Sequence, residues 1–282
     1  MSDWDRVWPA PAKLNLFLHV TGRRADGYHQ LQTVFRLIDC CDWLRFLPRA
    51  NPKVGLAQAL PGIEERDELS VRAARLLQRE TDCRRGVEIS IGKNIPVGGG
   101  LGGGSSDAAT TLIALNRLWN LGLSCQRLAE IGLTLGADVP FFLFGGNAFA
   151  EGIGERLETV ALPPAWYVVL VPPVSVSTRD IFAAPELTRN TKTITISSFS
   201  AGFGRNDLEA VVCGRHPEVA ACLAWLKDYG DARMSGSGAC VFAEFSTEAQ
   251  ARAVVSRLPS EIRGFAACGL DRHPLAADLA EG

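Results

Sequence analysis

A run of glycines constrains this chain more than any other feature. Six of the seven residues from 98 to 104 are glycine, and the run lies between an expected strand at 86–91 and an expected helix at 106–119. Glycine has no Cβ, so the backbone N–H groups of such a loop can approach a bound anion closely. The helix that follows adds its free N–H groups and the positive end of its dipole. The segment therefore predicts a binding site for phosphate groups.

Other kinds of glycine-rich segment fit the sequence less well. The dinucleotide-binding pattern G-x-G-x-x-G is present at Gly98, Gly100 and Gly103, but so many glycines match it trivially, and the acidic residue expected about 20 positions downstream is missing. The pattern G-x-x-x-x-G-K-[ST] fails because Gly104 occupies the lysine position. A mobile linker is the structural alternative, although a linker requires neither a strand before it nor a patterned helix after it.

Composition places the chain among ordinary globular proteins. Of its 282 residues, 47% are hydrophobic and 21% are charged, which excludes disordered and fibrous chains. The 29 basic and 31 acidic residues give a net charge of −2, without the basic excess of a general nucleic-acid-binding protein. Apolar runs are shorter than the roughly 20 residues of a membrane span, and the N-terminal segment lacks an apolar signal core. We therefore expect a cytoplasmic protein with neither nucleic-acid nor membrane partners.

The hydrophobic pattern predicts two domains. Residues 13–20 alternate as a strand with four apolar side chains on one face, Leu14, Leu16, Leu18 and Val20. Helices are expected to begin at Asp67 and Ser124 as N-caps, the second running to Leu135 with Gly136 after its last turn. The second half alternates strands and helices in an α+β manner: strands at 166–171, 239–245 and 264–268, and helices at 207–213, 217–229 and 247–258. We predict an α+β fold with domains at 1–152 and 153–282.

The glycine loop resembles the phosphate loop of the GHMP kinase superfamily, which has the form P-x-x-x-G-L-G-S-S-A-A. Here the segment runs from Pro96 to Ala109 with extra glycines, and this longer form is similar to the branch that acts on a CDP-linked methylerythritol. Further segments are similar to the same branch, namely 11–18, 26–33, 135–142, 205–209 and 235–239. The resemblance covers nearly the whole chain.

The resemblance implies the two-domain GHMP kinase fold, with an N-terminal nucleotide-binding domain and a C-terminal α+β substrate domain. It implies transfer of the γ-phosphoryl group of ATP, with Mg²⁺, to the 2-hydroxyl of the CDP-linked methylerythritol, in the non-mevalonate route to isoprenoid precursors. The implied phosphate-binding residues are Pro96, Val97, Gly98, Gly99, Gly100, Leu101, Gly102, Gly103, Gly104, Ser105 and Ser106.

Three polar residues are candidates for the catalytic cluster. An alcohol needs a base to become a nucleophile at neutral pH, and Asp138 is the candidate, on a turn held by Val139-Pro140, which favour extended backbone. A Lys13 ammonium beside it would keep the carboxylate ionised and stabilise phosphoryl charge, and Asn15 shares the face of Lys13. The alternatives are a solvated turn aspartate and a lysine that protects an edge strand. The resemblance assigns all three residues to catalysis.

Substrate recognition by the resemblance involves Tyr28 and Phe182, between which a cytosine would stack, and His29, which would bond the base edge. Thr178 is expected to contact the methylerythritol portion. The alternative for both aromatic residues is a place in the core.

The loop departs from the wider superfamily because Asp107 follows the two serines, so no magnesium ligand is assigned. Ser105 and Ser106 are candidates for capping the helix, binding phosphate, or both.

Two other functions compete with this one. The first is a GHMP kinase for another small alcohol, and the segment Asp26-Gly27-Tyr28-His29 argues against it. The second is a nucleotide-binding protein without catalysis. Lys13, Asn15 and Asp138 together argue against the latter. A monomer or weak homodimer is expected.

Overall fold

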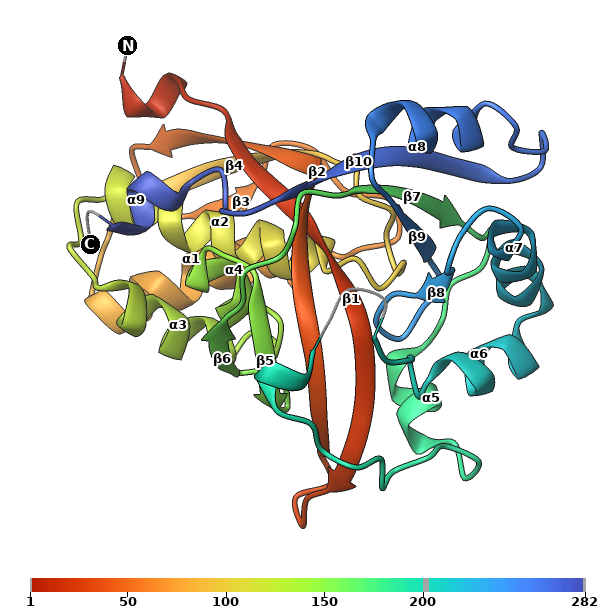
Figure 1. The fold of residues 1–282 in the computed structure, drawn as a ribbon. Helices are drawn as coiled ribbons and strands as arrows, with labels where there is room; N and C mark the ends of the chain where they lie inside the picture. Colours follow the sequence, from red (N-terminus) through yellow and green to blue (C-terminus); the bar gives the residue numbers. More distant parts are fainter. Residues whose placement is uncertain (1, 200–202, 281–282) are drawn as a thin grey trace.

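Two very long strands form the backbone of the fold (Figure 1). The computed structural model describes residues 2–199 and 203–280. β1 (Trp8–Arg23) and β2 (His29–Arg49) pair antiparallel and run through the molecule. The helices of the first half of the chain lie on one side of them, and those of the second half, apart from the last, lie on the other. The single strand expected at 13–20 is therefore the middle of a much longer element.

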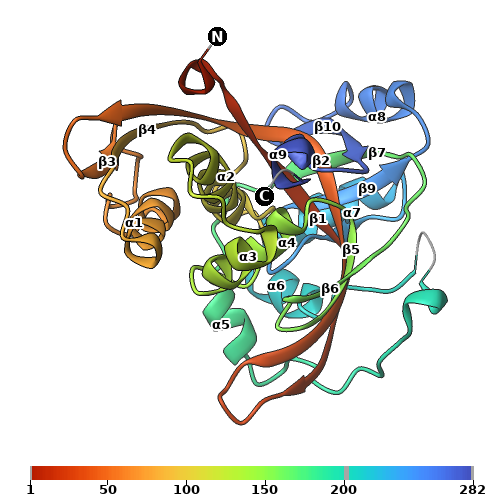
Figure 2. The same cartoon turned by 90° about the vertical axis from the view of Figure 1, so that its left-hand side faces the viewer.

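The first half of the chain builds one end of the sheet and its helical cover. Its other strands are β3 (Val54–Leu56), β4 (Gly86–Gly92), β5 (Ala148–Gly152) and β6 (Arg156–Thr159). Its helices are α1 (Leu69–Thr81), α2 (Gly103–Leu118), α3 (Cys125–Leu133) and α4 (Val139–Phe144), preceded by a short 3-10 turn at Asp3–Asp5. β4 pairs antiparallel with β2 and parallel with β3, and Figure 2 shows α1, α2 and α3 gathered on one side of these strands.

The second half adds four strands to the same sheet. They are β7 (Trp166–Val171), β8 (Arg233–Met234), β9 (Val241–Phe245) and β10 (Arg263–Leu270), and the path through the sheet is β3-β4-β2-β10-β7-β9-β8. The helices are α5 (Thr178–Ala183), α6 (Glu209–Arg215), α7 (Pro217–Lys227), α8 (Glu248–Val255) and α9 (Ala276–Ala280), with a 3-10 turn at Ile196–Ser198. β10 joins the halves by pairing with both β2 and β7.

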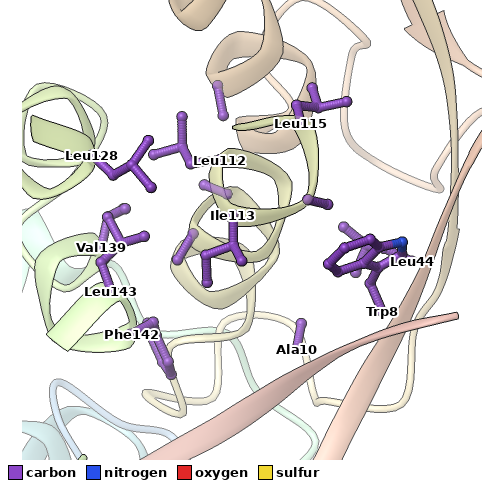
Figure 3. Close-up of a cluster of buried hydrophobic side chains, with 14 of the residues drawn as sticks. Trp8, Ala10, Leu44, Leu112, Ile113, Leu115, Leu128, Val139, Phe142 and Leu143 are labelled. Atoms are coloured by element: carbon purple, nitrogen blue, oxygen red, sulfur yellow. The ribbon is translucent and has the colours of Figure 1, made fainter. Parts of the chain in front are cut away.

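Helix α2 is the centre of the first hydrophobic core (Figure 3). Its side chains Leu112 and Ile113 are buried among residues of α3, α4 and the first strand, including Trp8, Leu128 and Phe142. A helix that is apolar on most sides must be enclosed by other elements, as this one is. The packing holds the N-terminal end of α2, and with it the glycine loop, in a defined position.

A bulge in β1 overturns the expected alternation. The pairing with β2 shifts between Asn15 and Leu18, so the chain gains a residue and the faces exchange. Leu14 and Leu16 consequently pack in one core cluster, whereas Leu18 and Val20 pack in another with the second half of the chain. The prediction that all four share one face is wrong because the pairing with β2, rather than the local pattern, sets the register.

Several helix ends also differ from those expected. The N-cap of α1 is Glu68, whose side chain accepts from Val71 N, rather than Asp67. Ser124 caps α3 as predicted, but that helix ends at Leu133 with Thr134 as C-cap, before Gly136. The last short helix, α9, returns to the first half of the chain, where Asp278 pairs with Arg6 at 2.8 Å. No helix among the described residues is long and apolar enough to cross a membrane.

Candidate active site

A cleft lies between the two halves of the chain and consists of adjoining hollows. The central one, of about 350 Å³, contains Lys13, Asn15 and Asp138. A hollow of about 690 Å³ lies along the glycine loop, and another of about 540 Å³ contains Tyr28 and His29. Thr178, at the start of α5, lines all of these hollows. Residues expected at the phosphate, catalytic and substrate positions thus border one continuous space.

The central hollow brings together Lys13, Asn15 and Asp138. Lys13 Nζ donates to Asn15 Oδ1 at 2.5 Å and lies 3.3 Å from Asp138 Oδ2. Asn15 Nδ2 donates to Thr33 Oγ1 at 3.0 Å, which fixes the orientation of the amide. The Lys13 side chain is only 3% exposed, so it does not fit the alternative of a solvent-facing lysine that protects a strand edge.

Asp138 lies on the turn between α3 and α4, as expected, but the local backbone is different. Val139 and Pro140 begin α4 instead of an extended segment, because proline is compatible with the first turn of a helix. Both are buried, together with Phe141 and Phe142. These apolar neighbours anchor the turn while the Asp138 side chain, 32% exposed, reaches the cleft.

The glycine loop requires glycine for both conformation and space. Gly98, Gly100 and Gly102 have φ angles of +71°, +74° and +73°, which residues with a Cβ rarely adopt. A Cβ on Gly100 would lie 2.2 Å from the carbonyl oxygen of Ser235. The loop is therefore pressed between β1 and the turn at 235–238, and this Cβ-free cradle fits the phosphate groups of a nucleotide.

The loop is fixed at several points along its length. Lys13 N donates to Leu101 O at 3.0 Å, and Ser235 Oγ donates to Gly100 O at 3.1 Å. α2 begins at Gly103, with Gly102 as an N-cap that makes no side-chain bond. The expectation that the helix starts at 106 is wrong, and so is capping by the two serines, which already lie inside its first turns.

Sequence reasoning missed a buried ion cluster at the base of the loop. Lys93 Nζ donates to Asp107 Oδ2 at 2.7 Å and also to Asp42 Oδ2. Asp42 Oδ1 accepts from Asn94 N at 2.6 Å and from Ile95 N at 2.8 Å. The cluster connects β2, the start of the loop and the first turns of α2. The sequence of β2 offers no signal for the cluster, because Asp42 is one of several charged residues along that strand.

The cluster contains more acidic than basic groups, because the two carboxylates of Asp42 and Asp107 share the single ammonium of Lys93. Burial raises the pKa of Asp107 to about 7, against the effect of Lys93. Burial lowers the pKa of Lys93, but the carboxylates of Asp107 and Asp42 outweigh it and the pKa is raised overall. Asp107 Oδ1 and Ser106 Oγ are buried without a hydrogen-bond partner among the described residues.

The third hollow holds the residues expected to recognise a base. Phe182 stacks on His29, with ring centroids 5.0 Å apart and planes at 30°, whereas the side chain of Tyr28 is 60% exposed. Thr178 Oγ1 and Ser237 Oγ are 2.7 Å apart, which links α5 to the turn behind the glycine loop. Both aromatic residues line the hollow, although Phe182 is half-buried and also packs against the core of the second half of the chain. No sequence pattern indicated a role for Arg189, whose side chain donates a hydrogen bond to His29.

Comparisons with known proteins agree with this geometry. The model of the GHMP kinase N-terminal domain matches residues 68–146, and that of the GHMP kinase C-terminal domain matches residues 194–264. A 4-diphosphocytidyl-2-C-methyl-D-erythritol kinase from Thiobacillus denitrificans is 60% identical over 271 residues, which cover 96% of this chain and 98% of the relative. The chain belongs to this kinase family.

Structural relatives support the same conclusion. A crystal structure of 4-(cytidine 5′-diphospho)-2C-methyl-D-erythritol kinase superposes with a TM-score of 0.82 at 35% identity, covering 94% of this chain and 99% of that one. A mevalonate kinase superposes with a TM-score of 0.65 at 14% identity, covering 94% and 99%, and this likeness shows the fold alone. The predicted α+β GHMP kinase fold is confirmed. As a GHMP kinase, the protein uses ATP as its phosphate donor.

Proposed function

We propose that the cleft transfers the γ-phosphoryl group of ATP to the 2-hydroxyl of 4-diphosphocytidyl-2-C-methyl-D-erythritol and forms its 2-phosphate. The observation that carries this proposal is the meeting of Lys13, Asn15 and Asp138 in front of the glycine loop. The names of the relatives supply the acceptor. Binding of a nucleotide alone would require no carboxylate beside the loop.

Asp138 is the proposed general base. Its carboxylate would accept the proton of the acceptor hydroxyl as the oxygen attacks the γ-phosphorus, a contribution typically of about 10²–10⁴ in rate. Lys13, held by Asn15 and Asp138, would place a positive charge where negative charge develops on the transferring group. Asn15, whose amide is oriented by Thr33, would help to position the hydroxyl.

The glycine loop is the proposed site for the phosphates of ATP. Residues 96–105 line the hollow beside it, and Ser106 lies buried directly behind them. Among the described residues, no group of three His, Cys, Asp or Glu side chains has the arrangement to hold a metal ion. We expect Mg²⁺ to accompany the nucleotide phosphates, where it would neutralise their charge.

The hollow containing Tyr28, His29, Thr178 and Phe182 is the proposed site for the cytidine portion and the nearby sugar alcohol. An apolar hollow with a few polar groups suits a base that stacks and forms edge hydrogen bonds.

We assign residues 1–152 to the nucleotide domain and 153–282 to the substrate domain, a boundary that falls in the turn between the paired strands β5 and β6. We expect a monomer or weak homodimer that acts in the cytoplasm, where ATP is abundant.

Phosphorus NMR of the purified protein with ATP and Mg²⁺ tests the proposal. Parallel samples contain the CDP-linked methylerythritol, homoserine, mevalonate or galactose. We expect a new monophosphate ester signal, with stoichiometric ADP, only in the first sample. A signal in another sample would overturn the acceptor and favour a kinase for a different alcohol. Intact ATP in every sample would favour a nucleotide-binding protein without catalysis.

A further inference from the structure

Arg189 is held by hydrogen bonds from each of its guanidinium nitrogens. Nε donates to His29 Nε2 at 3.1 Å, and Nη1 donates to Leu187 O at 3.0 Å. Nη2 donates to Phe182 O at 3.0 Å and to Ala184 O at 2.6 Å. One side chain therefore fixes both the end of α5, which carries Phe182, and the imidazole ring that stacks on it.

The contact with His29 decides which ring nitrogen carries the proton. A guanidinium has only donors and stays protonated in proteins, so the ring nitrogen that faces it must be the unprotonated acceptor. A neutral imidazole then carries its hydrogen on the other nitrogen, Nδ1. Burial, with the nearby charges of Arg189 and Arg23, lowers the pKa of His29, which favours the neutral ring.

We propose that Arg189 is a positioning residue that holds His29 as the neutral Nδ1–H tautomer, a hydrogen-bond donor that selects cytosine over uracil. The inference rests on the proposed function, which supplies a cytidine substrate. N3 of cytosine is an acceptor, whereas N3 of uracil carries a hydrogen and would meet the Nδ1–H of His29 donor to donor. Among the described residues, Arg189 provides the hydrogen bond made to the imidazole ring of His29, and this bond uses Nε2.

The surroundings of His29 are compatible with this role. The charged and titratable groups around the same hollow are Arg23 on β1, Asp26 and Tyr28 in the following turn, and Arg179 on α5. Asp26 pairs with Arg24 at 2.8 Å, so its carboxylate is already engaged. The cations near the ring therefore oppose its protonation to an imidazolium. An imidazolium would donate from both nitrogens, so Nε2 would no longer accept from Arg189.

Nitrogen NMR of the free protein tests the tautomer without any substrate. The chain has 4 histidines, so long-range ¹H–¹⁵N spectra are simple, and His29→Gln identifies the signal of His29. We expect the Nδ1–H tautomer in the wild-type protein and a shift towards Nε2–H in Arg189→Leu. An Nε2–H ring in the wild-type protein, or the same tautomer in both proteins, would overturn the proposal.

Kinetics with two substrates that differ in their base test whether the fixed tautomer selects cytosine over uracil. The ratio of kcat/KM for the CDP-linked substrate to that for its UDP-linked analogue should fall about tenfold or more in Arg189→Leu, because the fixed donor is lost. The KM for ATP should stay within about twofold, since Arg189 does not line the hollow beside the glycine loop. An unchanged ratio would contradict a selective role for Arg189.

Arg215→Leu is the matched control. Arg215 also holds the segment around α5, through Asp180 O at 3.3 Å and Glu186 at 2.7 Å, but it does not touch His29. An equal loss of selectivity in this variant would reduce Arg189 to a structural support. If Arg189→Leu does not fold, Arg189→Gln replaces it, because its amide donates to carbonyls yet no longer dictates the tautomer. Wild-type protein inactive on the cytidine substrate would refute the proposed function, while the NMR result still decides the tautomer.

Discussion

Lys13 and Asp138 form an ion pair, 3.3 Å from Nζ to Oδ2, in which the cation is buried and the anion reaches the cleft. The lysine is 3% exposed and the aspartate 32%. Asn15 Oδ1 accepts a second hydrogen from the ammonium, so Lys13 is restrained by partners on two elements. The partial exposure of Asp138 leaves its carboxylate open to the cleft, as its proposed role of general base requires.

Replacing Asp138 by asparagine should reduce kcat by about 10²–10⁴, because an amide of nearly the same shape does not accept the proton. The affinity for ATP should change by no more than a few-fold. Steady-state kinetics and nucleotide titration measure the two effects. The exposed Asp228, at the end of α7, provides a control in Asp228→Asn, which should retain full activity. Full turnover in Asp138→Asn would remove this residue from the mechanism.

Gly100→Ala should weaken ATP binding by about tenfold or more, since the new Cβ would lie 2.2 Å from Ser235 O and displace the loop. Gly122→Ala is a matched control: its φ is +64°, and no atom lies within 4 Å of the added Cβ. Both variants should lose about 1 kcal/mol of stability from the left-handed backbone. Isothermal titration measures the ATP affinity of each variant. Equal affinities in Gly100→Ala and Gly122→Ala would refute the proposed cradle.

Lys93→Met should destabilise the protein by about 3 kcal/mol or more, because it leaves the buried carboxylates of Asp42 and Asp107 without their cation. The double variant Lys93→Met/Asp107→Asn should recover part of this loss, since one of the two charges is gone. Urea unfolding measures both values. A cost below about 1 kcal/mol for the single variant would show that the cluster contributes little to holding the loop.

His273 should make the protein sensitive to acid. Burial lowers its pKa to about 4, and its Nδ1 accepts from Leu275 N at 3.0 Å. Because the pKa of an unfolded histidine is near 6.5, the unfolded chain binds more protons between these values, and stability falls as the pH drops from about 6.5 to 4. This group alone accounts for roughly 3 kcal/mol over that range.

His273→Asn removes the titrating ring and keeps an acceptor near Leu275 N. The measured quantity is the difference in unfolding free energy between the two proteins at pH 4 to 7. The comparison must be a difference, since Asp107, with a pKa raised to about 7, contributes in the opposite direction over much of this range. We expect the wild-type protein to lose stability relative to the variant as the pH falls. A constant difference would contradict the prediction.

The proposed catalytic cluster shows how much of the site the sequence predicted. The glycine loop and Lys13 were recognisable because their chemistry is unusual for their positions: a run of glycines between strand and helix, and a lysine in an apolar strand. Asp138 was assigned through the resemblance to the GHMP kinases. Their distance from one another was not recognisable. It depends on the pairing of β1 with β2 and on the packing of α4 against α2, which join residues far apart in the chain.

The features that the sequence did not predict correctly depend on contacts between distant segments. The helix was expected from 106, but α2 begins at Gly103, although glycine is a poor helix former. A Cβ on Gly103 would lie 3.1 Å from Ile95 Cγ2, so contact with the neighbouring segment favours glycine there. Arg189 and Asp42 were missed because nothing local distinguishes a charged residue that turns inward from one that faces water.

The sequence by itself determined the family, through its motifs along the chain. It also determined features that depend on short stretches of chain: the glycine loop before α2, the cap at Ser124 and the strand at 166–171. These follow from backbone sterics and local hydrogen bonds, which neighbouring residues control. Only the tertiary structure decided the bulge after Asn15, the cluster around Lys93 and the contact of Arg189 with His29. Register, burial of charge and tautomer depend on partners that folding brings together from distant parts of the chain.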